Sequence, residues 1–311
     1  MRHLLYFDSL ARHGHFGRAA EACAITQPAL SLQIKELEEL TGATLVERGG
    51  RQIRLTDLGA EFAVRVKDIL RQVDDLEDLV RARLSPVLTR LRMGVIPTVA
   101  PYLLPRFIAE LTALHPGLDL HIRETLTPRL LTEIDEGRLD AAIVALPVSQ
   151  PGLEEVTLFT ESFLLVREVS QADHPVPDRE ALGAMRLLLL EEGHCFRDQA
   201  LSFCDMERRQ PREWLDGSSL STLVQMVGAG IGVTLIPEMA VPVETRSAPV
   251  AVTRFTDPQP QRSIGMVWRR SNPLSEGLTR VAAILQNAAR GQQSQSTERI
   301  VMPLRPDVRM R

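Results

Sequence analysis

The chain has 311 residues, of which 44% are hydrophobic and 24% are charged, and its formal net charge is −4. This length suits two or three domains with sizeable cores, and the slightly acidic balance excludes a protein that coats nucleic acid over its whole surface. The three cysteines, the lack of a signal-peptide pattern and the lack of a membrane-length apolar run predict a reducing, cytoplasmic setting and no membrane partner.

The first 56 residues have the pattern of three short helices. A third helix is expected over 27–40, with Thr26 as its N-cap and Pro28 in its first turn. Helix, tight turn and helix is the arrangement in which the second of the two helices enters the major groove of DNA. The residues expected to contact DNA from the third helix are Gln27, Pro28, Ser31, Gln33 and Lys35.

A basic hairpin is predicted directly after these helices. Two short strand patterns within 47–55 flank a Gly-Gly turn. Arg48, Arg51 and Arg54 would form a wing on the phosphate backbone. A hairpin that is merely solvated is the alternative, and the adjoining helix pattern favours DNA contact over it.

A long helix with a near-heptad apolar seam is predicted from Asp57 to about Leu84. Such a helix needs a partner along its seam, so we expect homodimerisation. Ser85-Pro86 ends the helix, and residues 57–90 are interpreted as a dimerising linker and hinge. The seam consists of Leu58, Phe62, Val66, Ile69, Val73, Leu76 and Val80.

After residue 90, strand and helix patterns alternate, which predicts a largely parallel sheet. A second such set covers 163–239, and a returning strand is expected at 264–268. Residues 91–290 are therefore predicted to form two α/β lobes joined by crossing strands. The tail at 291–311 is rich in Gln and Ser and then in Arg, so we expect it to be disordered or loosely packed.

Two of the cysteines, Cys195 and Cys204, are nine residues apart. Within one helix their Cα atoms would be roughly 13 Å apart, whereas a disulfide needs about 5.5–6 Å, so the segment would have to refold before they could bond. Cys195 lies between His194 and Arg197 in a polar, partly cationic setting that favours the thiolate, and apolar spacing turns Cys204 inward.

Oxidation of Cys195 to a sulfenic acid, followed by condensation with Cys204, would suit this asymmetry. Spacing alone leaves two alternatives open, namely two unrelated thiols or a metal site that also uses His194. The third thiol, Cys23, is expected to pack in a core among the small residues of the second helix.

Three stretches of the chain resemble the LysR-type transcriptional regulators over nearly its whole length. The run from His15 to Glu38 is similar to the winged helix-turn-helix of that family, and the run from Val95 to Pro105 is similar to the start of its regulatory domain. The third stretch, from Gly193 to Gln199 with Phe203-Cys204 following, is the most specific. It narrows the resemblance to the peroxide-sensing OxyR branch.

The resemblance implies a fold and a set of site residues. The fold would be an N-terminal winged helix-turn-helix (1–56), a linker helix and a two-lobed, periplasmic-binding-protein-like α/β regulatory domain. Cys195 would be the peroxidatic thiol and Cys204 the resolving thiol. The hydroxyl groups of a peroxide pocket can hydrogen-bond peroxide, and a cation can stabilise the charge on thiolate and leaving hydroxide. The residues at matching positions are Thr98, Thr127, His194, Asp198 and Arg262.

The sequence thus predicts a peroxide-responsive transcriptional regulator of oxidative-stress genes that is not an enzyme and uses no cofactor or metal. Its expected partners are double-stranded promoter DNA, further copies of itself as a homodimer and by resemblance a homotetramer, RNA polymerase as a candidate, and hydrogen peroxide as the signal. In the alternative, a small anionic effector in the interlobe cleft gates a LysR-type regulator whose thiols are incidental. An enzyme or solute-binding protein on the same two-lobed fold is a third hypothesis, against which the helix-turn-helix counts.

Overall fold

The computed structural model describes residues 1–47, 53–84, 89–203, 216–256 and 258–300. By its internal contacts the chain divides into two compact units, Met1–Leu84 and Ser85–Arg311. Among the described helices, none is long and apolar enough to cross a membrane.

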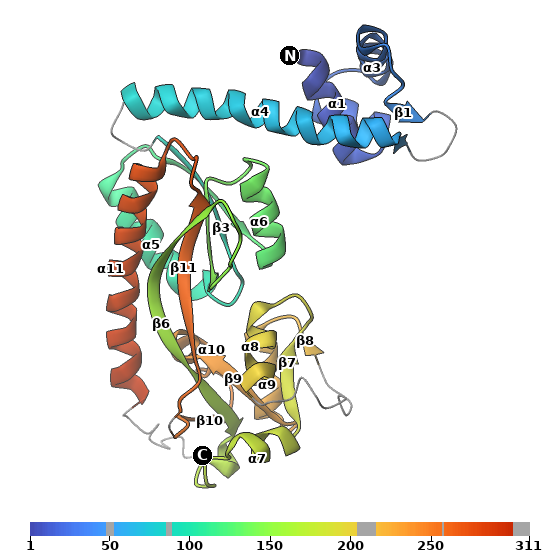
Figure 1. Ribbon diagram of the computed structural model, residues 1–311. Helices are drawn as coiled ribbons and strands as arrows, with labels where there is room; N and C mark the ends of the chain where they lie inside the picture. The colour runs from blue at the N-terminus through green and yellow to red at the C-terminus, as the bar shows by residue number, and fades with distance from the viewer. Residues whose placement is uncertain (48–52, 85–88, 204–215, 257, 301–311) are drawn as a thin grey trace, which may run out of the picture. The chain divides into compact units, whose positions relative to one another are not determined.

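The N-terminal unit consists of helices around a small core and a short hairpin (Figure 1). The third helix begins where the N-cap predicts, because Thr26 Oγ1 accepts a hydrogen bond from the backbone N–H of Ala29 at 3.4 Å. Leu30, Ile34 and Leu37 form the buried stripe of this helix. The elements are α1 (Arg2–His13), α2 (Phe16–Ala22), α3 (Gln27–Thr41), β1 (Val46–Glu47), β2 (Arg54–Leu55) and α4 (Asp57–Leu84).

The predicted apolar seam of α4 is partly buried in the core of its own unit and partly exposed. Near its start, the Phe62 ring packs edge-on against Phe7 of α1, with centroids 5.3 Å apart, and Val66 is buried in the same core. Further along, Leu76 and Val80 are 61% and 57% exposed. Phe62 and Val66 therefore help to form the core of their own unit, and the later part of the seam presents an exposed apolar surface within this unit.

Cys23 differs from its expected place in a core. It is the C-cap of α2 and is partly exposed, whereas Ala19 and Ala20 of the same helix are buried. Helix α2 ends at Ala22, directly before Cys23. Cys23 therefore lies outside the regular helix and is not on the buried face that Ala19 and Ala20 form.

The second unit is built on a nine-stranded sheet in the order β4-β3-β5-β11-β6-β9-β7-β8, with β10 paired to β6. The first lobe contains β3 (Arg90–Val95), α5 (Ala100–Leu114), β4 (Asp119–Glu124), α6 (Thr127–Asp135) and β5 (Ala141–Leu146). The second lobe contains η1 (Val169–Gln171), α7 (Arg179–Ala184), β7 (Leu187–Leu190), α8 (Cys195–Phe203), β8 (Asp216–Gly217), α9 (Leu220–Gly228), β9 (Val233–Pro237), η3 (Glu238–Ala240), α10 (Val241–Glu244) and β10 (Val250–Thr253).

Two long strands run through both lobes, as Figure 1 shows: β6 (Leu153–Glu168) and β11 (Gln261–Arg269). They pair with each other in antiparallel register, while the pairs β3·β4, β3·β5, β7·β8 and β7·β9 are parallel. This confirms the predicted two-lobed α/β fold with crossing strands. Apolar side chains from both lobes and both crossing strands form one continuous core.

The first part of the tail, which was expected to be disordered or loosely packed, is helical. Helix α11 (Ser275–Ile300) packs against α5 and β6 and continues through residues 291–300. A helix hydrogen-bonds its own backbone locally, and this stretch contains no proline before Pro303, so a polar composition does not end it. Residues 301–311 lie outside the described residues.

Candidate functional site

One face of α3 presents the residues that were predicted to contact DNA. Gln27, Pro28 and Lys35 are exposed and Ser31 is partly exposed, and their helical spacing places them on one side, away from the buried stripe. Gln33 lies on a different side of the helix, and its side-chain amide donates to Glu36 Oε2 at 2.7 Å. In the predicted wing, Arg54 is exposed on β2, and Arg48 and Arg51 lie outside the described residues.

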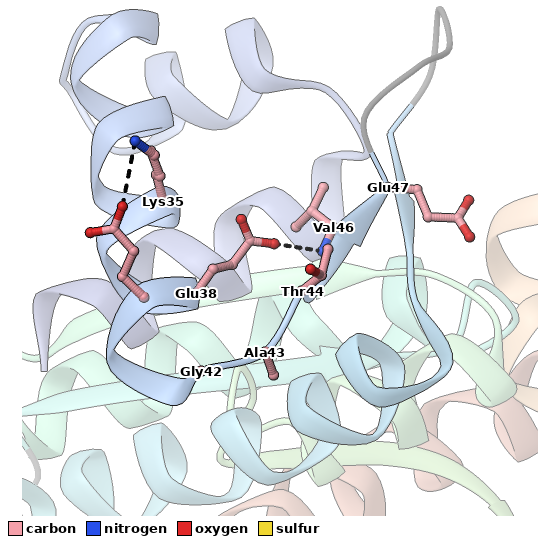
Figure 2. Close-up of a pocket in the computed structure, with 8 residues that line it drawn as sticks. Lys35, Glu38, Gly42, Ala43, Thr44, Val46 and Glu47 are labelled. Atoms are coloured by element: carbon pink, nitrogen blue, oxygen red, sulfur yellow. Dashed lines mark hydrogen bonds and ion pairs between the residues drawn. The ribbon is translucent and has the colours of Figure 1, made fainter.

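A cavity of about 500 Å³ lies between the second half of α3 and β1 (Figure 2). Its carboxylate Glu38 accepts hydrogen bonds from the backbone N–H groups of Leu45 and Val46 at 2.8 and 3.0 Å, and Lys35 pairs with Glu39 at 3.4 Å. Glu38 thus ties α3 to the first strand of the hairpin. With Glu47 also on its rim, the cavity is acidic and does not suit a phosphate.

Cys195 is the first residue of α8, a helix of 9 residues that ends at Phe203. Its thiol is partly buried. The helix is held at its start by Arg197, whose Nη1 donates to the carbonyl of Leu190 at 2.7 Å and to Asp216 Oδ1 at 2.6 Å. Arg197 therefore anchors the helix to the end of β7. Cys204, which follows directly, lies outside the described residues.

Phe196 connects the first turn of α8 to the crossing strands. Its buried ring packs edge-on against Phe163 of β6, with centroids 4.9 Å apart. The guanidinium carbon of Arg262 lies 5.4 Å from the centroid of the same ring. The residue next to Cys195 is thus in contact with Arg262 of β11.

Arg262 in turn contacts Thr98, which follows β3 in the first lobe. Its Nη1 donates to Thr98 Oγ1 at 2.8 Å, and its Nη2 donates to the carbonyl oxygen of Thr98 at 3.0 Å. Both residues are only 3% exposed. The two contacts join residues 164 positions apart in the chain.

The turn before Cys195 approaches the start of α6. Gly193 has φ of +93°, a conformation that favours glycine, and a Cβ placed on it would lie 3.0 Å from Leu126 Cδ1. Thr127, the next residue, begins α6, and its Oγ1 is buried without a hydrogen-bond partner among the described residues. A buried hydroxyl without a partner is costly, which makes Thr127 available to a small polar molecule.

Comparisons with known proteins match both units. The family model described as "Bacterial regulatory helix-turn-helix protein, lysR family" matches residues 1–60, and the model "LysR substrate binding domain" matches residues 86–290. The DNA-binding transcriptional dual regulator OxyR of Escherichia coli K12 is 38% identical over 291 residues, which cover 92% of this chain and 94% of that protein. The chain belongs to the LysR family, in its OxyR branch.

Other relatives and solved structures agree. A probable hydrogen peroxide-inducible genes activator of Streptomyces viridosporus is 41% identical, covering 91% of this chain and 92% of that protein. A full-length OxyR variant from Pseudomonas aeruginosa matches with a TM-score of 0.72 at 34% identity, covering 91% of this chain and 93% of that one. A hydrogen-peroxide-bound OxyR mutant from Corynebacterium glutamicum matches with a TM-score of 0.66 at 32% identity, covering 99% and 98%.

His194 and Asp198 have different surroundings in this OxyR-type domain. Burial lowers the pKa of His194 below its ordinary value of 6.5, against the opposing effect of the Glu191 charge. His194 is therefore neutral near pH 7, which leaves Arg262 as the cation on the side of Thr98. Asp198 is exposed in the first turn of α8, where a carboxylate complements the positive end of the helix dipole.

Two further residues of the site are absent from the sequence-based prediction. Gln199 lies one helical turn after Cys195, and its Oε1 is buried without a partner among the described residues. Glu161 of β6 is 4% exposed and accepts a hydrogen bond from Arg262 Nε at 2.9 Å. Burial raises its pKa, while the charge of Arg262 and hydrogen bonds from Arg262 and Met239 act to lower it. A lone carboxylate in the strand-like stretch from Leu158 to Val166, directly before the apolar run from Phe163 to Val166, was the signal that could have identified it.

Proposed function

We propose that this chain is a peroxide-responsive transcriptional regulator in which Cys195 is the thiol that peroxide oxidises and Cys204 is the resolving thiol. The observation that carries the proposal is the buried Arg262–Thr98 pair, which Phe196 links to the first turn of α8. Membership of the OxyR branch supports the same chemistry, because the relatives are named as peroxide-inducible activators.

The first step is oxidation of the sulfur. The Cys195 thiolate attacks one oxygen of hydrogen peroxide, the O–O bond breaks, and the other oxygen leaves with the electron pair as hydroxide and takes up a proton to become water. Thr98 and Thr127 would hydrogen-bond the peroxide, and Arg262 would stabilise the negative charge that moves from sulfur to the leaving oxygen. His194, neutral near pH 7, would act as a hydrogen-bonding group, and Asp198 as a supporting charge at the start of the helix.

The second step joins the two sulfurs. The Cys204 thiol attacks the Cys195 sulfenic acid, the S–O bond breaks, and water leaves as the disulfide forms. Helix α8 separates Cys195 from the residue before Cys204 by its whole length, about 12 Å at 1.5 Å per residue. Disulfide formation therefore requires α8 to unwind, and this change in the second lobe is the proposed signal.

The output is proposed to be altered binding to promoter DNA in the cytoplasm. The exposed face of α3 with Arg54, and the wing arginines Arg48 and Arg51, would contact the duplex. The exposed apolar residues in the second half of α4, such as Leu76 and Val80, support a homodimer along that helix, and a homotetramer that recruits RNA polymerase is the fuller form of the proposal. One peroxide is consumed per switching event, so the chain acts as a sensor and not as a turnover enzyme.

The structure favours this function over gating by a small anionic effector between the lobes. At the interlobe contact, Tyr102 of α5 donates to Glu244 Oε1 at 2.6 Å, and Ser221 in the first turn of α9 donates to Glu244 Oε2 at 2.5 Å. Burial and the neighbouring Glu244 carboxylate raise the pKa of Tyr102 above its usual range, which keeps it a donor. A carboxylate of the chain itself thus occupies hydroxyls that an anionic effector would use.

The experiment that tests the proposal is mass spectrometry of thiol-blocked peptides from the full chain, before and after addition of stoichiometric hydrogen peroxide. We expect a peptide pair crosslinked through Cys195 and Cys204, with Cys23 still free. The variant Cys204→Ser should stop at oxidised Cys195, and Cys195→Ser should not react. The variant Cys23→Ser is the matched control and should behave as the wild type.

Two outcomes would contradict the proposal. If Cys195 stays reduced in the presence of peroxide, the sensing thiol is wrongly assigned. If Cys204→Ser still changes its DNA footprint in response to peroxide, the disulfide is not the signal.

A further inference from the structure

Glu161 is a buried carboxylate on the crossing strand β6, in a stretch with Leu158 and Phe159 before it and the apolar run from Phe163 to Val166 after it. Its side chain is 2% exposed. Burying a charge costs free energy unless it is paired and hydrogen-bonded, so a glutamate at such a position requires specific partners.

The partners of Glu161 come from two other parts of the fold. It lies opposite Arg262 in the register of β6 and β11, and its Oε1 accepts from Arg262 Nε and Nη2 at 2.9 and 2.8 Å. Its Oε2 accepts from the backbone N–H of Met239 in η3 at 3.0 Å. Both carboxylate oxygens are therefore used, and the carboxylate holds one edge of the guanidinium in place.

The geometry of Arg262 decides what Thr98 can do. A guanidinium has five N–H groups, and the contacts to Glu161 and Thr98 account for all but one of them, which is on Nη1. Thr98 Oγ1 accepts from that same Nη1, so the hydroxyl proton of Thr98 must point to another acceptor. Among the described residues, one Nη1 proton and one hydroxyl proton thus remain for a small molecule next to Thr98.

We propose that Glu161 is a positioning residue for the oxidation of Cys195 by peroxide, which it promotes by holding Arg262 so that these two protons face the departing oxygen. This inference rests on the proposed function. In the step concerned, sulfur bonds to one peroxide oxygen while the O–O bond breaks, and the other oxygen leaves as hydroxide that hydrogen bonds from Thr98 and Arg262 stabilise. Glu161 itself touches neither the sulfur nor the peroxide.

If the Glu161–Arg262 ion pair only stabilised the fold, its loss would affect the reactions of Cys195 differently than if Glu161 positions Arg262. Alkylation of the Cys195 thiolate by iodoacetamide expels iodide and needs no donor for a departing oxygen. A structural defect that moved Cys195 or changed its ionisation would alter alkylation and peroxide oxidation together. Loss of positioning would slow peroxide oxidation alone.

The experiment compares reduced full-length wild type with Glu161→Gln, Glu161→Asp and the control Glu154→Gln, an exposed glutamate on the same strand. Oxidation of Cys195 by hydrogen peroxide and its alkylation by iodoacetamide are followed over a range of pH by thiol-trapping mass spectrometry. We expect peroxide oxidation of Glu161→Gln to be about 10-fold to 100-fold slower, as misplaced catalytic geometry commonly causes. Its alkylation profile should match that of the wild type, and Glu154→Gln should match in both reactions.

The charge-conserving Glu161→Asp keeps the ion pair, and with it the fold, but its side chain is one methylene shorter. It should be slower with peroxide than the wild type even if Glu161→Gln proves unstable. In a Thr98→Val background, Glu161→Gln should cause little further loss, because both residues act on the same oxygen.

The inference is overturned if wild type and both Glu161 variants react equally fast with peroxide. It is also overturned if peroxide oxidation and alkylation slow by the same factor, or if the Glu161 and Thr98 effects multiply as independent ones. Failure of the proposed function has a separate signature, since wild-type Cys195 would then itself be unreactive towards peroxide.

Discussion

The two sides of the candidate site are held in very different ways. On one side, Arg262 and Glu161 of the crossing strands and Thr98, which follows β3, are all at most 4% exposed. They are joined by hydrogen bonds that use nearly every N–H donor of Arg262. On the other side, α8 has 9 residues, of which Phe196 and Ala200 are buried. The first side is a rigid, hydrogen-bonded group of buried residues, and the second is a short helix with few buried side chains.

This contrast explains how one site can both react with peroxide and transmit the reaction as a structural change. A network of buried charges cannot rearrange without exposing an unpaired group, so it keeps its geometry through the reaction. A short helix is marginally stable by itself and depends on its packing, so a bond between its ends can unwind it at modest cost. The reacting geometry therefore belongs to the strands, and the structural change belongs to α8.

The largest expected effect comes from removing the cation of the rigid side. Arg262→Leu would leave Glu161 buried without its partner, so we expect a loss of roughly 3–5 kcal/mol in the free energy of unfolding. Peroxide oxidation of Cys195 should slow on the order of 100-fold in the folded fraction. Denaturant unfolding and thiol trapping measure the two effects, and an unchanged unfolding curve would refute the buried-pair account.

The second-largest effect is expected in the turn before Cys195, which approaches the start of α6. Gly193→Ala should destabilise the fold by about 1–2 kcal/mol through its positive φ, and further through contact with Leu126. Gly117→Ala is the matched control, because Gly117 has φ of +88° and nothing within 4 Å of an added Cβ. Thermal unfolding of both variants isolates the contact, and equal losses would show that the approach to Leu126 is unimportant.

A smaller effect is expected at the far end of α8. The Phe203 ring packs edge-on against Phe255 at 5.2 Å, and the Arg179 guanidinium lies 4.8 Å from its centroid. Phe203→Leu should cost about 1 kcal/mol and loosen the reduced helix. Because the helix must unwind for the disulfide to form, oxidised Cys195 should be resolved faster, as measured by the rate of disulfide appearance. A slower rate would mean that Phe203 guides the unwinding instead of opposing it.

The smallest expected effect is a pH dependence of the free energy of unfolding that arises from His194. Its pKa is lower in the folded state than the ordinary 6.5, so below that pH the unfolded chain takes up the proton more readily and stability falls. Wild type should therefore lose more unfolding free energy than His194→Asn as the pH falls from about 7.5 to about 5. Equal slopes for the two proteins would show that burial of His194 has no energetic consequence.

Much of the local structure could be predicted from the sequence. Thr26 and Pro28 marked the start of α3, and Asp57 and Ser85-Pro86 bounded α4. Each of these signals acts within a few residues, because helix caps, proline and apolar periodicity work through neighbouring backbone and side chains. The tail was expected to be disordered or loosely packed, and composition alone did not indicate that helix α11 continues to Ile300.

What the sequence by itself determined is the order of the elements, the spacing of Cys195 and Cys204 and the membership of the OxyR branch, because each depends on short motifs in the chain. Only the tertiary structure decided that Glu161 faces Arg262 and that Arg262 reaches Thr98, contacts that join positions 101 and 164 residues apart. Those contacts depend on the register of β6 against β11 and on the packing of two lobes, and a shift of one residue in that register would turn Glu161 to the other face of the sheet.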